Sequence, residues 1–193
     1  MGDKLTKYFY HGSGQGGIRC LEARSLLHGT EERVVYLTDS LPYALFYLWD
    51  EGHVGFSCKH VTSWVKDGIV YYEEQFPGQL KAFYQGACGY LYRMAIEDGY
   101  CPVEGRETMY YVATAQDVEK TEYISDVYAE ILRQEALGTV RVLRFEEQTE
   151  ERKAWLTEMV AEGIRRANHY AEEPERAEFM KHYFPASWQM ANR

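Results

Sequence analysis

Tyr10-His11-Gly12-Ser13 closes a short aromatic run that begins at Lys7, and the chain continues into a glycine-rich stretch at 14–17. The aromatic run predicts a β-strand, because aromatic residues favour the pleated, half-buried surface of a sheet. A histidine at the end of a strand, followed by glycine, brings an imidazole and an unobstructed backbone to one place. The segment is therefore a candidate binding site, with a surface histidine before a flexible turn as the plain alternative.

A second segment contributes two tyrosines. The run at 33–38, which ends in Val35-Tyr36-Leu37-Thr38, predicts another strand. Asp39-Ser40 before Leu41-Pro42 predicts a helix start, because Asp or Ser caps a helix and Pro fits its first turn. Tyr47 falls in the expected third turn of that helix. Rings from a strand and from a returning helix can flank a flat heteroaromatic ring, although both tyrosines would also serve as ordinary core residues.

Outward from these segments, the pattern predicts further strands at 68–72, 89–94, 108–112 and 139–145, each rich in β-branched or aromatic residues. A 3.6-residue period over 124–137 predicts a helix that ends at Gly138. Short, tightly turned strands with few helices indicate an α+β fold with two small, mostly antiparallel sheets. We expect this domain to cover residues 1–147.

Residues 148–193 are expected to form a helical extension packed on that domain. A second short helix is predicted between Pro174 and Pro185. The first helix, from Thr149, carries an apolar stripe that would pack on the domain or bind a partner. The stripe consists of Trp155, Leu156, Met159, Val160, Gly163, Ile164 and Ala167.

The composition is that of an ordinary globular protein. The 193 residues are 46% hydrophobic and 26% charged, enough to bury a core without disulfides or metals. A net charge of −9 argues against a general coat on nucleic acid, which needs clustered Lys and Arg. Because no apolar run approaches the ~20 residues of a membrane span and no secretory signal is visible, we expect a cytoplasmic protein outside the membrane.

The four cysteines predict neither a disulfide framework nor a metal site. Cys20, Cys58, Cys88 and Cys101 are scattered and form no C-x-x-C pair, as expected for reduced thiols. Cys58 and His60 supply two metal ligands where a structural zinc wants four. No metal is therefore expected.

Residues 8–47 resemble the first two motifs of the diphtheria-toxin class of ADP-ribosyltransferases, which includes the poly(ADP-ribose) polymerases and the rifampin ADP-ribosyltransferases. The resemblance is carried by the strand ending in Tyr-His-Gly-Ser, by Val-Tyr-x-Thr and by the helix with Ala44-Leu45-Phe46-Tyr47. It implies that the two sheets form a cleft for NAD as co-substrate. It also implies the roles of the matching residues.

In this family the motif histidine, here His11, hydrogen-bonds a ribose hydroxyl, and the following glycine, here Gly12, offers its backbone to the nicotinamide carboxamide. The two tyrosines, here Tyr36 and Tyr47, sandwich the nicotinamide. Ser13 and Ser40 complete the NAD site that the resemblance implies, with Ser40 reaching the carboxamide. His11 and Tyr36 count among the expected catalytic residues as well.

A glutamate at the start of a later strand is the third feature that the resemblance implies. Glu107, ahead of the strand at 108–112, is the expected catalytic residue; Glu73 and Glu74 are alternatives, and Glu130 is a weaker one because it falls in an expected helix. Breaking the nicotinamide–ribose bond builds oxocarbenium-like charge, which a carboxylate stabilises while it orients or deprotonates the acceptor. A solvated carboxylate at a strand edge is the plain alternative for Glu107.

The sequence thus predicts NAD-dependent mono-ADP-ribosyl transfer to an acceptor that is a protein, a nucleic acid or a small molecule. A binding module of the same fold without turnover is the first rival, and a protein-interaction domain is another. An RNA 2′-phosphotransferase shares the fold but needs several basic residues in its cleft, and the acidic composition argues against it. The oligomeric state is left open.

Overall fold

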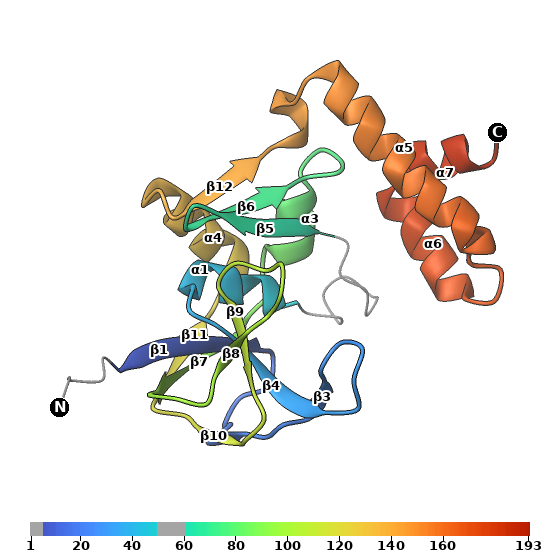
Figure 1. Cartoon of the computed structure of the whole chain (residues 1–193). Helices are drawn as coiled ribbons and strands as arrows, with labels where there is room; N and C mark the ends of the chain where they lie inside the picture. The colour runs from blue at the N-terminus through green and yellow to red at the C-terminus, as the bar shows by residue number, and fades with distance from the viewer. Residues whose placement is uncertain (1–5, 50–60) are drawn as a thin grey trace.

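The computed structural model describes residues 6–49 and 61–193 (Figure 1). Its strands are β1 Lys7–Ser13, β2 Cys20–Leu21, β3 Ser25–Leu26, β4 Arg33–Thr38, β5 Thr62–Lys66, β6 Ile69–Glu73, β7 Gly89–Ile96, β8 Cys101–Pro102, β9 Met109–Val112, β10 Gln116–Asp117, β11 Lys120–Ile124 and β12 Val140–Leu143. Its helices are α1 Leu41–Ala44, α3 Gln79–Tyr84, α4 Val127–Ala136, α5 Glu150–Arg166, α6 Pro174–Tyr183 and α7 Pro185–Ala191, with 3₁₀ turns η1 Leu45–Tyr47, η2 Phe145–Glu147 and η3 Asn168–Tyr170.

These strands form three sheets within the described ranges. The largest has seven strands in the order β11-β7-β1-β4-β9-β8, with β3 on β4; the others are β12-β6-β5 and β10-β2. Every pairing among them is antiparallel except β12 with β6. The α+β class is therefore confirmed, with three sheets where two were expected. Figure 1 shows α1 between the seven-stranded and the three-stranded sheet.

The local signals in the sequence explain α4. Asp126 caps the helix, its carboxylate accepting from the Ala129 amide at 2.9 Å, and Gly138 stops it with a φ of 78°. The helix begins three residues later than the periodicity predicted. Ile124 instead ends β11, where it pairs with Gly89, because the neighbouring strand supplies hydrogen bonds that periodicity alone does not reveal.

The segment after β4 is shorter and tighter than the predicted helix. Ser40 caps α1 as predicted, accepting from the Tyr43 amide at 3.3 Å, but α1 ends at Ala44 and the chain tightens into η1. Tyr47 therefore lies at the end of a 3₁₀ turn rather than in the third turn of an α-helix. Because i and i+3 side chains align in a 3₁₀ turn, Leu45 and Leu48 point into the core together, both fully buried.

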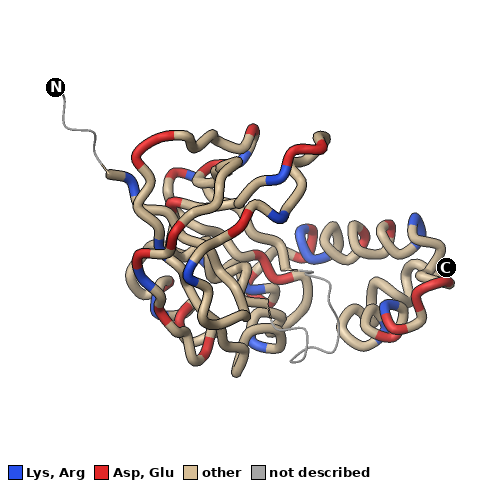
Figure 2. Tube along the Cα trace, turned by 90° about the horizontal axis from the view of Figure 1, so that it is seen from below, with Lys and Arg blue, Asp and Glu red and all other residues tan. Residues whose placement is uncertain are grey.

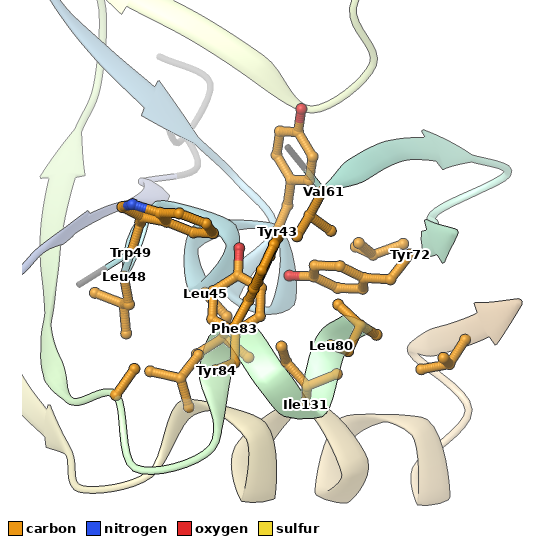
Figure 3. Close-up of a cluster of buried hydrophobic side chains, with 14 of the residues drawn as sticks. Tyr43, Leu45, Leu48, Trp49, Val61, Tyr72, Leu80, Phe83, Tyr84 and Ile131 are labelled. Carbon is orange, nitrogen blue, oxygen red and sulfur yellow. The ribbon is translucent and has the colours of Figure 1, made fainter. Parts of the chain in front are cut away.

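A core of large side chains fixes this segment in place. Figure 3 shows it, with Tyr43, Leu45, Leu48, Trp49, Val61, Tyr72, Leu80, Phe83, Tyr84 and Ile131 labelled. Two buried phenols tie other elements to α1 and η1: Tyr72 of β6 donates to the Pro42 carbonyl at 3.2 Å, and Tyr84 of α3 donates to the Phe46 carbonyl at 3.1 Å. A buried phenol keeps its hydrogen bond only in one geometry, so these bonds orient the segment that carries Tyr47.

The C-terminal helices gather on one side of the molecule (Figure 1). Thr149 caps α5 by accepting from the Arg152 amide, and Pro174 begins α6. Phe179 and Tyr183 of α6 lie 5.9 and 5.0 Å from the ring of Phe83. No described helix is long and apolar enough to cross a membrane.

The predicted stripe on α5 is wrong for three of its residues, since Gly163 is exposed as well as Trp155 and Met159. Leu156 and Ile164 are fully buried, but Trp155 is 50% and Met159 39% exposed. The buried face of α5 turns toward α7 and leaves Trp155 on the surface, where its ring lies under the Arg152 guanidinium at 4.1 Å.

Ending the chain at Phe145 is expected to give an insoluble or molten product. The cut removes α5–α7, which cover Phe76 and Phe83, and removes Arg152, whose guanidinium pairs with buried Glu73 at 2.8 Å. Burying each large apolar side chain is worth about 1.5–3 kcal/mol, against about 5–15 kcal/mol for a whole domain. Near-ultraviolet circular dichroism and a thermal melt test this. A soluble fragment that melts cooperatively would contradict it.

Candidate functional site

The candidate site lies where β1 and β4 separate. They are paired at Tyr10 and Thr38 and held by a Lys7–Asp39 ion pair at 2.7 Å, while β1 stays paired with β7 through Ser13. Past Tyr10, a cavity of about 50 Å³ opens between the two strands. It is lined by Tyr10, His11, Gly12, Tyr36, Leu37, Thr38, Tyr47 and Met109.

A larger cavity of about 820 Å³ adjoins the first, since Tyr36, Tyr47 and Met109 line both. Its other walls are Leu27, His28, Pro102, Val103, Glu104, Arg106 and Tyr111. Small-molecule and cofactor sites commonly measure about 300–1,000 Å³. A narrow apolar pocket thus leads into a wider cleft that carries charged groups.

His11 is held in a defined tautomer. Its Nδ1 lies 3.0 Å from the carbonyl oxygen of Tyr36. A carbonyl can only accept, so Nδ1 carries the proton in this hydrogen bond. The imidazole is half-buried on the cavity wall.

The two tyrosines reach the same cavity from different elements. The Tyr36 hydroxyl donates to the Leu26 carbonyl at 3.3 Å and accepts from the His28 amide at 3.2 Å. These two bonds, to the end of β3 and to the loop after it, hold the Tyr36 ring in place. The Tyr47 hydroxyl donates weakly to Met109 Sδ at 3.7 Å. Burial raises the pKa of Tyr47, with Tyr43 adding to the shift, so this phenol stays neutral at ordinary pH.

Gly12 lets the α1–η1 segment lie against β1. A Cβ at this position would be 2.3 Å from the Ala44 carbonyl oxygen and 3.3 Å from the Tyr47 Cβ. Any side chain would therefore push away the segment that carries Tyr47. The glycine of the motif has a structural reason here, besides the role that the family resemblance implies.

Neither of the two predicted serines, Ser13 and Ser40, lines either cavity. The Ser13 hydroxyl accepts from the Gln15 amide at 3.1 Å, and the Ser40 hydroxyl caps α1. Both hydroxyls shape the backbone around the site, Ser13 at the end of β1 and Ser40 at the start of α1.

The turn between β8 and β9 brings charged groups to the cleft. Glu107 is exposed in this turn, two residues before β9, and it is not among the residues that line either cavity. Glu104 and Arg106 of the same turn do line the larger one. The turn is closed by the Arg106 amide, which donates to the Val103 carbonyl at 3.1 Å, with Gly105 at a φ of 69°.

The alternative carboxylates are occupied elsewhere. Buried Glu73 pairs with Arg152 at 2.8 Å, and buried Glu74 accepts from the Leu80 and Phe145 amides at 3.0 and 3.2 Å. Burial raises the pKa of Glu74, and the two amides oppose that shift. Glu130 on α4 pairs with Arg133. Glu73 and Glu74 join elements of the fold, Glu130 pairs within α4, and none of the three lines the two cavities.

Sequence reasoning missed several residues of the cleft wall: Tyr10, His28, Glu104, Arg106 and Met109. Tyr10, Arg106 and Met109 lay in or beside a recognised motif, whereas His28 and Glu104 did not. His28 lies in a loop far in sequence from the turn that carries Glu104 and Arg106, and no local pattern signals that these two loops will meet. Cys20, Cys88 and Cys101 are free thiols, whereas Cys58 and His60 lie outside the described residues.

Comparisons with known protein families, with curated proteins and with solved structures find no match for this chain.

Proposed function

We propose that this chain is an NAD-dependent mono-ADP-ribosyltransferase. The observation that supports this most is the convergence of His11, Tyr36 and Tyr47, from β1, β4 and η1, on one apolar cavity. A shared flat ligand gives a reason for that grouping beyond core packing. The wider cavity, of about 820 Å³, has the volume of a cofactor site, and it shares Tyr36, Tyr47 and Met109 with the narrow pocket.

The side chains fit the parts of NAD in turn. The nicotinamide ring would lie against Tyr36 and Tyr47, whose rings are held by other contacts before a ligand arrives. A ribose hydroxyl would hydrogen-bond the His11 imidazole, whose ring is oriented by the bond from Nδ1 to the Tyr36 carbonyl. Arg106 in the wider cleft would face the negatively charged pyrophosphate.

The reaction would transfer ADP-ribose from nicotinamide to an acceptor. As the bond from ribose C1′ to nicotinamide breaks, positive charge develops on the ribose, and a carboxylate beside it lowers the barrier. The β8–β9 turn, which carries Glu104 and Glu107, is the source of that carboxylate in this proposal. The same carboxylate can take the proton from the acceptor.

NAD is expected to raise the melting temperature of the protein. At one hundred times the dissociation constant, binding to the folded state alone adds about 2.7 kcal/mol of stability. His11→Ala should weaken NAD binding by roughly fivefold, the equivalent of about 1 kcal/mol for one hydrogen bond. His182→Ala, on the exposed surface of α6, is the matched control and should bind as wild type does. A wild-type protein without any shift at millimolar NAD would refute the proposal.

A binding module without turnover is the second candidate, and one observation favours it. Glu107, the residue expected to act on the ribose, does not line the cavities. Saturable NAD binding without nicotinamide release, with water or with any offered acceptor, would support this candidate over the enzyme.

The RNA 2′-phosphotransferase reading receives less support. Among the described residues that line the two cavities, Arg106 is the sole Lys or Arg. Figure 2 shows Lys and Arg scattered along the chain among Asp and Glu rather than gathered in a basic stripe. A polyanionic RNA end needs several cations in the cleft.

A further inference from the structure

A separate cavity of about 80 Å³ lies across β1 from the candidate NAD site. It is lined by Tyr10, Leu41, Leu91, Arg93, Lys120 and Glu122. Tyr10 lines both this cavity and the narrow pocket. The strand order places the narrow pocket toward β4 and β9, and this cavity toward β7 and β11.

Strand register brings two cations to this place. Tyr10 of β1 pairs with Arg93 of β7, and Arg93 pairs with Lys120 of β11, so the three side chains form one row on one face of the sheet. Glu122, two residues after Lys120, lies on the same face. Leu41 of α1 and Leu91 give the cavity apolar walls, which weaken screening by water.

Arg93 has a donor that the fold does not use. Its Nη2 donates to Glu119 at 3.2 Å, and its guanidinium lies 4.5 Å from the centre of the Tyr8 ring. These contacts hold the side chain in position, yet its buried Nε has no hydrogen-bond partner in the structure. A buried donor without an acceptor is rare, because it has lost its hydrogen bond to water without gaining one to the protein, which costs free energy.

We propose that this cavity binds a single oxyanion group, a phosphate or a carboxylate, between Arg93 and Lys120. The Arg93 guanidinium would donate to one oxygen of the anion, and the Lys120 ammonium would supply the second positive charge. The cavity has room for one such group rather than for a nucleotide. Glu122 opposes the anion and keeps its affinity modest. The site is independent of the proposed ADP-ribosyl transfer.

Titration with inorganic phosphate tests the proposal on the full-length protein. Chemical shifts of backbone amides are followed at constant ionic strength, with acetate as a second arm that separates phosphate from carboxylate binding. We expect saturable shifts at β7 and β11 in at least one arm. Arg93→Gln should weaken binding by roughly tenfold or more, since it removes a charge-assisted hydrogen bond.

Two further variants keep the test independent of folding defects. Lys120→Gln alters an exposed residue and should weaken binding, whereas Glu122→Gln removes the opposing carboxylate and should strengthen it. Arg133→Gln, an exposed arginine that pairs with Glu130 on α4, is the matched control and should bind as wild type does. Binding that does not saturate in either arm, or that is unchanged in both Lys120→Gln and Glu122→Gln, would overturn the proposal.

Discussion

Gly12→Val is expected to destabilise the protein strongly and to abolish NAD binding. The Cβ of the valine would lie 2.3 Å from the Ala44 carbonyl oxygen, so the side chain would displace the segment that carries Tyr47. Overpacking of this kind costs about 1–3 kcal/mol, which lowers the melting temperature by about 2–4 °C for each kcal/mol in a domain of this size. Thermal and denaturant melts measure the loss.

Gly14→Val is the matched control, two residues further along the chain and just past the end of β1. Nothing lies within 4 Å of a Cβ at Gly14, and the residue is exposed. The change should leave stability within about 0.5 kcal/mol of wild type, as for most surface substitutions. Equal stability of the two valine variants would show that α1 and η1 can move away from β1 at little cost, and that Gly12 does not set the pocket.

Glu107→Gln is expected to lower the rate of nicotinamide release by about 10²–10⁴-fold, the usual contribution of a catalytic acid or base. NAD affinity should stay within about twofold of wild type, because the carboxylate acts on charge that develops in the transition state. The change keeps the shape of the side chain and removes its charge. Release of nicotinamide and NAD binding are measured separately.

Glu104→Gln, on the same turn, is the decisive comparison. Glu104 lines the larger cavity and Glu107 does not, so the turn would have to shift for Glu107 to reach the ribose. If Glu104→Gln loses turnover and Glu107→Gln keeps it, the catalytic carboxylate lies three residues earlier and the assignment of Glu107 is wrong. If both keep full turnover, this turn does not supply the carboxylate.

Glu73→Gln and Glu74→Gln serve as structural controls. Glu73 is held by Arg152, and Glu74 by the Leu80 and Phe145 amides, so both should lower the melting temperature. Neither should change the turnover of the protein that remains folded. A folded Glu73→Gln or Glu74→Gln protein that binds NAD without cleaving it would restore the alternative assignment.

Much of the secondary structure follows from the sequence. The aromatic and β-branched runs at 7–10, 33–38, 68–72, 89–94, 108–112 and 139–145 all contain strands. Gly138 ends α4, and Thr149 begins α5, as their residue types predict. These features rest on steric and hydrogen-bond preferences that act within a few residues, so a single sequence carries them.

Strands without a strong pattern of their own were missed. β11 is exposed along four of its five residues and carries Lys120 and Glu122, so its composition resembles a surface loop. It is a strand because β7 offers a free edge for it to pair with. The length of α1 and the exposure of Trp155 were likewise decided by what packs against them.

The sequence by itself determined the α+β class and pointed to His11, Tyr36 and Tyr47 as one group. Only the tertiary structure placed the three on one cavity, because β1 and β4 separate just past the Tyr10–Thr38 pair. The tertiary structure also put Glu104 and Arg106 on the cleft wall and gathered Arg93 with Lys120. These groupings join loops and strands distant in the chain, and strand register and packing, which are not local properties, bring them together.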